Sequence, residues 1–169
     1  MDTRQNLHRL VTAALFAAAI TVVTAYLLHI PIPTGGYIHL GDTLIYLAAC
    51  LLPVPYAAAA AAIGAGLADL LTAPVWVLPT LIIKALIVLP FTSRGERLLC
   101  RRNILALVAA GVFSPLAYSL ANCVIAGTMA AFVPQFVPTL IQAVGSSVLF
   151  LVIAPALDGV KLKTRLAGR

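Results

Sequence analysis

The chain has 169 residues, of which 62% are hydrophobic and 9% are charged, and its formal net charge is +6. Soluble domains are closer to half apolar and a quarter charged, so this composition excludes an ordinary soluble protein and favours one membrane domain over residues 1–169. A basic groove for nucleic acid would need interleaved aromatic residues and a polar face, and neither is present. Ten of the eleven Lys and Arg instead form three clusters typical of cytoplasmic segments: Arg4 and Arg9; Arg94, Arg97, Arg101 and Arg102; Lys161, Lys163, Arg165 and Arg169.

The apolar runs predict an all-α, six-helix membrane bundle with both termini in the cytoplasm. The first run, about residues 7–28, is long enough to span roughly 30 Å of hydrocarbon. Prolines follow it where a signal peptide would carry small residues, so we expect this helix to be retained. The other helices are predicted at about residues 42–52, 56–71, 75–91, 103–126 and 135–157.

The predicted helix over residues 42–52 is short. At 1.5 Å per residue it reaches only about 16 Å, so a re-entrant segment is the alternative. With three crossings before Arg94, the first two basic clusters would lie on opposite sides of the membrane. With four crossings all three clusters are cytoplasmic, which favours a spanning helix.

Polar residues repeat at helical spacing on one face of each of the last three predicted helices. In the predicted topology these faces occupy the outer half of the membrane, so the helices predicted at 75–91, 103–126 and 135–157 could line a cavity open to the exterior. The alternative is hydrogen bonding between helices, which such residues commonly supply. The residues are Trp76, Thr80 and Lys84; Ser114, Tyr118 and Asn122; and Gln135, Thr139, Gln142 and Ser146.

Charged groups inside membrane segments are functional candidates because burying charge in hydrocarbon is costly. We expect Lys84 to contact a ligand, to form an ion pair with Asp69, or to do both. Asp42 either faces the site or caps the helix that follows Gly41. Trp76 either faces the site or belongs to an interfacial aromatic belt.

His39 lies on the glycine-bearing loop from residue 29 to residue 41, which would cover the cavity. A metal site with Asp42 and His29 has no recognised ligand spacing, so we predict no metal and no cofactor.

Small residues recur three and four apart near the start of the first helix. Ala13, Ala14, Ala17 and Ala18 would let another helix approach closely, either inside the protein or in a partner.

The run from YIHLGD to TLIIKAL, together with the alanine spacing in the first helix, resembles the substrate-binding S components of energy-coupling factor (ECF) vitamin transporters. The resemblance implies a prokaryotic cell-membrane protein that captures a vitamin-like molecule from outside. Its implied partners are a membrane coupling subunit, docked on Ala13 and Ala17 or on Ala14 and Ala18, and two cytoplasmic ATPases. The chain has no GxxxxGK[ST] sequence, so ATP hydrolysis would be supplied by the partners.

The resemblance also implies a small heteroaromatic substrate such as pyridoxine, hydroxymethylpyrimidine or riboflavin. Tyr37, Trp76 and Tyr118 could stack on its ring. The predicted substrate-binding set is His39, Asp42, Asp69, Trp76, Lys84, Tyr118, Asn122 and Gln142.

A membrane scaffold and an intramembrane enzyme are the alternatives to a transport function. A membrane scaffold would use the alanine faces but would not need the polar faces. An intramembrane enzyme would need a nucleophile and base, or paired carboxylates, at one depth, and no such set is apparent, so we predict that the chain is not an enzyme.

Overall fold

The computed structural model describes residues 3–27, 29–33 and 36–166. Four helical segments are long and apolar enough to cross a membrane: α1 (Thr3–Tyr26), α3 (Val54–Thr72), α5 (Arg101–Ala126), and the 3₁₀ turn η2 (Met129–Ala131) continued by α6 (Phe132–Gly159). The shorter elements are α2 (Asp42–Leu51), the 3₁₀ turn η1 (Pro74–Trp76), α4 (Val77–Val88) and α7 (Leu162–Leu166). The predicted all-α membrane class is confirmed, whereas the count of six crossings stays a prediction.

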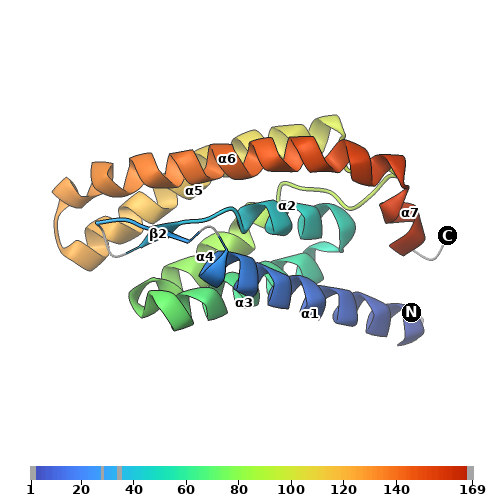
Figure 1. The fold of residues 1–169 in the computed structure, drawn as a ribbon, viewed down its shortest axis with the longest axis horizontal. Helices are drawn as coiled ribbons and strands as arrows, with labels where there is room; N and C mark the ends of the chain where they lie inside the picture. Colours follow the sequence, from blue (N-terminus) through green and yellow to red (C-terminus); the bar gives the residue numbers. More distant parts are fainter. Residues whose placement is uncertain (1–2, 28, 34–35, 167–169) are drawn as a thin grey trace.

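The helices lie roughly along the long axis of the molecule (Figure 1). α5 packs along α6, while α3 packs between α1 and α4, and α2 touches α1, α3, α4 and α6. Three parts of the chain lie at one end of the molecule (Figure 1): the start of α1, the basic segment that precedes α5, and the short helix α7. The described parts of the three basic clusters therefore lie at one end of the molecule, while the side of the membrane that this end faces stays a prediction.

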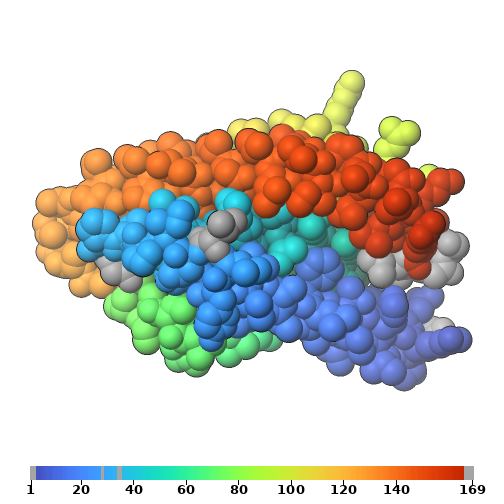
Figure 2. All heavy atoms as spheres, in the orientation of Figure 1, coloured from blue at the N-terminus to red at the C-terminus, as the bar shows by residue number. Residues whose placement is uncertain are grey.

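The segment between α1 and α2 contains a small hairpin that the sequence pattern did not predict. β1 (Ile30–Pro31) pairs antiparallel with β2 (Tyr37–Ile38), with Ile30 opposite Ile38. Figure 2 shows the light-blue hairpin segment lying against the orange surface of α6, and β2 contacts α6. Two-residue strands carry little periodic signal, which explains why the segment looked like an irregular loop.

Predicted helix 75–91 is divided in the structure. Pro74, Val75 and Trp76 form a 3₁₀ turn, and the α-helix proper runs from Val77 to Val88. The predicted polar face of this helix therefore begins in a different backbone conformation from the rest of the helix.

α1 and α3 approach closely at Gly64. A Cβ atom there would lie 2.7 Å from the carbonyl oxygen of Ala17, and the Thr21 hydroxyl donates to the Gly64 carbonyl at 2.9 Å. Glycine is required because any side chain would separate the two backbones. Ala13 and Ala17 face this contact, whereas Ala14 and Ala18 are exposed.

The connection from α4 to α5 has little regular structure but is held by side chains of three helices. The Asp158 carboxylate accepts hydrogen bonds from the backbone N–H groups of Leu98 and Leu99, at 2.7 and 3.1 Å. Asn103 donates to the carbonyls of Thr92 and Leu98, and Lys163 donates to the carbonyls of Arg94 and Arg97.

Candidate functional site

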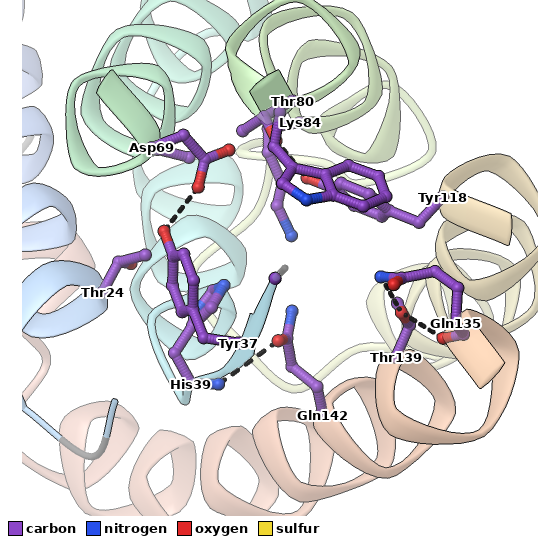
Figure 3. A pocket seen from close by; sticks show the side chains of 13 residues that line it. Thr24, Tyr37, His39, Asp69, Thr80, Lys84, Tyr118, Gln135, Thr139 and Gln142 are labelled. Carbon is purple, nitrogen blue, oxygen red and sulfur yellow. Dashed lines mark hydrogen bonds between the residues drawn. The ribbon is translucent and has the colours of Figure 1, made fainter. Parts of the chain in front are cut away.

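A polar cavity lies beneath the hairpin, between the helices (Figure 3). Its free volume is about 30 Å³, enough for about one water molecule. Sites that hold drug-sized ligands measure roughly 300–1,000 Å³, so a larger guest would require the hairpin or the walls to move. The lining residues are Thr24, Gly36, Tyr37, His39, Ala65, Asp69, Trp76, Thr80, Lys84, Tyr118, Gln135, Thr139 and Gln142.

Six of the eight residues selected from the sequence line this cavity: His39, Asp69, Trp76, Lys84, Tyr118 and Gln142. The expectation that three helices form the walls was incomplete. Thr24 comes from α1, and Ala65 and Asp69 come from α3, so the cavity is enclosed by five helices and the hairpin segment.

The floor of the cavity is a buried ionic network. The Lys84 ammonium lies 2.6 Å from Asp42 Oδ1, and both side chains are 1% exposed. Gln142 Nε2 donates to Asp42 Oδ2 at 3.1 Å, so both carboxylate oxygens are satisfied. The suggested pairing of Lys84 with Asp69 is wrong, because the start of α2 brings Asp42 closer to the ammonium.

Asp42 also lacks the capping role considered for it. It is the first residue of α2, Gly41 is the N-cap, and no side chain caps the helix. Asp42 does not line the cavity itself but lies beneath Lys84, with its carboxylate directed at the ammonium rather than at the backbone.

At the rim of the cavity, which is the side covered by the hairpin, Tyr37 joins the hairpin to α3. The Tyr37 hydroxyl of the hairpin donates to Asp69 Oδ1 of α3 at 2.5 Å. The ring of Tyr37 stacks on His29, with centroids 3.9 Å apart. Burial, and then the nearby Asp69 carboxylate, raise the pKa of the Tyr37 phenol, so it remains a donor at neutral pH.

Two aromatic side chains form the wall opposite the hairpin. Trp76 and Tyr118 lie 5.9 Å apart between ring centroids, and the Lys84 ammonium lies 5.1 Å from the centre of the Tyr118 ring. The Tyr118 hydroxyl shares a hydrogen bond of 2.8 Å with Thr80. Trp76 is only 3% exposed, so the belt interpretation, which needs an indole at the lipid surface, is wrong.

His39 links the hairpin segment to the floor. Its backbone N–H donates to Gln142 Oε1 at 3.2 Å, and its Nδ1 accepts from the Gly41 N–H at 3.0 Å. Burial lowers the pKa of His39 to about 4, so the ring is neutral at pH 7. In the described residues, His39 forms no metal-ligating group with Asp42 and His29.

Asn122 does not line the cavity. Its side-chain amide donates to the Ala131 carbonyl at 2.8 Å and so fixes the turn between α5 and α6. Asn122 was selected because it lies four residues after Tyr118 on the same helix face. This one further helical turn places Asn122 beyond the cavity, at the turn between α5 and α6.

Several lining residues were not selected from the sequence. Thr80, Gln135 and Thr139 lie on the predicted polar faces, so selecting each face as a whole would have found them. Thr24 lies three residues after Thr21 in the first apolar run, so the spacing of these two threonines is the signal that could have identified it.

The chain is similar in sequence to a family of membrane transport proteins and to an archaeal protein. Residues 4–158 match the family model described as "ECF-type riboflavin transporter, S component". An uncharacterised protein of Pyrococcus woesei is 34% identical over 130 residues, which cover 75% of this chain and 86% of that protein.

Proposed function

Because the chain belongs to the family of ECF-type riboflavin transporter S components, we propose that it captures a small vitamin-like molecule from outside the cell in the cavity beneath the hairpin. Membership makes it a plasma-membrane transporter component rather than an enzyme. The observation that carries the proposal is the cavity itself, which is lined by five residues selected from the apolar segments and by His39 of the loop that covers it.

The lining chemistry suits a small ring with polar edges. Tyr37, Trp76 and Tyr118 offer aromatic faces, while Asp69 and Lys84 offer an acceptor and a donor. Riboflavin is the first ligand to test because the family description names it, and pyridoxine and hydroxymethylpyrimidine share the ring chemistry. Entry would require the hairpin to lift, since the closed cavity is too small for any of the three.

The test is ligand capture by the purified chain in nanodiscs. We expect a retained small molecule, released by denaturation and identified by mass spectrometry, and saturable binding of one of the three vitamins without ATP. Lys84→Ala, measured after confirming that the protein is folded, should weaken binding. A chain that retains nothing and binds none of the three would contradict capture and favour the scaffold interpretation.

The family further implies a membrane coupling subunit and two ATPases, and the exposed Ala14 and Ala18 are the proposed contact on α1. Changing both to Leu should abolish uptake in cells that contain the coupling subunit and ATPases, while leaving ligand binding intact. The matched pair Ala13→Leu and Ala17→Leu should instead destabilise the chain, because these residues face α3. Normal uptake by the Ala14/Ala18 variant would exclude this surface as the contact.

A further inference from the structure

Two buried polar atoms that line the cavity have no hydrogen-bond partner within the described residues. They are Nε1 of Trp76, a residue 3% exposed, and the hydroxyl oxygen of Thr24, a residue 1% exposed. Buried polar groups are usually satisfied, so unpartnered ones that face a cavity indicate where a guest would form hydrogen bonds. The other unpartnered atoms belong to residues that do not line this cavity.

The Trp76 nitrogen sets the chemistry of that guest because an indole N–H can only donate. The ring packs against Tyr118, and its nitrogen faces the hairpin segment at Gly36. A Cβ atom at Gly36 would lie 3.5 Å from Nε1 and 3.8 Å from the neighbouring ring carbon. The Trp76 N–H is therefore covered by the Gly36 segment, whose backbone has no side chain at this point, so a small displacement of the segment would admit an acceptor atom of a guest to the N–H.

The charges around the cavity restrict the guest further. The described residues lining the cavity or directly beneath it carry one ammonium, Lys84, and two carboxylates, Asp42 and Asp69. Lys84 is already neutralised by Asp42, and the partners of Asp69 are the neutral hydroxyl groups of Tyr37 and Thr80. An anionic group would therefore enter a buried site with no free compensating charge.

We propose that the Trp76 N–H donates a hydrogen bond to a neutral acceptor of the captured molecule, a carbonyl oxygen or ring nitrogen, and that the site rejects molecules bearing a phosphate or carboxylate group. This inference rests on the proposed capture function and adds a specificity-determining residue and a substrate class to it. It makes Gly36 part of the site because any larger residue would occupy the position of the acceptor.

The experiment exploits the fact that Trp76 is the chain's single tryptophan. Expression in a tryptophan auxotroph fed β-(benzothiophen-3-yl)alanine replaces only this side chain, with a sulfur in place of the N–H and nearly unchanged shape. The probes are riboflavin, pyridoxine and hydroxymethylpyrimidine, each tested beside its phosphate ester by calorimetry in nanodiscs.

We expect the isostere to bind the preferred probe about tenfold more weakly, the size of one lost hydrogen bond. The phosphate ester should bind at least a hundredfold more weakly than its parent, because it adds an uncompensated charge. In ¹⁵N-labelled wild-type chain, the one indole N–H resonance should shift downfield on saturation. Thermal unfolding of the ligand-free isostere protein, expected to match the wild type, controls for packing.

The outcomes separate the two proposals. A probe that binds the isostere and wild type equally, or leaves the indole resonance unmoved, overturns the role of Trp76 while capture stands. Equal binding of the phosphate ester, or retention of a carboxylate-bearing molecule by the purified chain, overturns the charge selection while capture stands. If no probe binds and no molecule is retained, capture fails and this inference fails with it.

Discussion

The carboxylate on the floor of the cavity is paired with a charged group, whereas the carboxylate at the rim is bound by neutral hydroxyl groups. On the floor, Asp42 is bound by the Lys84 ammonium and by Gln142, so both of its oxygens are satisfied by rigid helices. At the rim, Asp69 is bound by Tyr37, which belongs to a hairpin of two-residue strands.

This difference separates a fixed part from a part that can open. Breaking the floor takes the counter-ion from the buried Asp42 carboxylate, which is strongly unfavourable, whereas breaking the rim removes one neutral phenol from Asp69 and leaves Thr80 as its partner. We therefore expect the floor to stay fixed and the hairpin to be the part of the cavity that opens. The following predictions test that contrast, beginning with the largest effect.

Replacing Lys84 with Met should destabilise the protein by roughly 3–5 kcal/mol, because Asp42 would be left buried without its counter-ion. Thermal unfolding in detergent would measure the loss. The double variant Lys84→Met with Asp42→Asn should recover most of the stability, since it removes both charges. A single variant as stable as the wild type would show that the floor is not the fixed part.

Acidification should destabilise the protein by protonating His39, whose hydrogen bonds to Gln142 and Gly41 hold the hairpin segment to the floor of the cavity. The folded pKa of about 4 lies below the ordinary value of 6.5, so the unfolded chain binds a proton that the folded chain does not. The contribution of neutral His39 to the free energy of unfolding is therefore fully present above about pH 7. It decreases as the pH falls towards 4, by roughly 2 kcal/mol between pH 7 and pH 5. Comparing the melting temperature with that of His39→Asn, which keeps an acceptor for Gly41, isolates this contribution. Parallel pH profiles for the two proteins would contradict it.

Gly41→Ala should destabilise by about 1.5 kcal/mol, because the new methyl group would lie 2.0 Å from the Thr24 hydroxyl. The backbone at Gly41 is right-handed helical, so the cost is steric and not conformational. Adding Thr24→Ala should restore the melting temperature. If it does not, the close approach of α1 to the start of α2 is not the cause.

The smallest effect is expected at the rim. Tyr37→Phe removes the phenol bound to Asp69 and should cost about 1 kcal/mol in stability, while ligand dissociation becomes several-fold faster. Stopped-flow displacement of bound ligand would report the rate. Tyr26→Phe, at a tyrosine that is 67% exposed, is the matched control and should change neither quantity.

The sequence was most informative where spacing alone decides which residues share a helix face. Trp76, Tyr118 and Gln142 come from three separated segments, and each was identified because polar residues recur at helical spacing in an apolar run. The family assignment likewise followed from the run around His39 and Asp42.

Spacing could not decide which elements meet. Whether Lys84 pairs with Asp42 or with Asp69 depends on where α2 begins relative to α4, a tertiary property absent from any single segment. Asn122 shows the converse limit, since a residue in phase with a polar face can lie beyond the end of the site. The inward role of Ala17 depended on a glycine in another helix, which no pattern within α1 reveals.

At the basic end of the molecule, Asp158, Asn103 and Lys163 hold the connection between α4 and α5 by its backbone. That segment exposes arginines yet is already ordered. Surfaces that are rigid before association lose less conformational entropy when a partner binds. If this basic end is cytoplasmic, as the sequence predicts, it is preorganised for repeated docking and release, while the hairpin that covers the cavity lies at the opposite end.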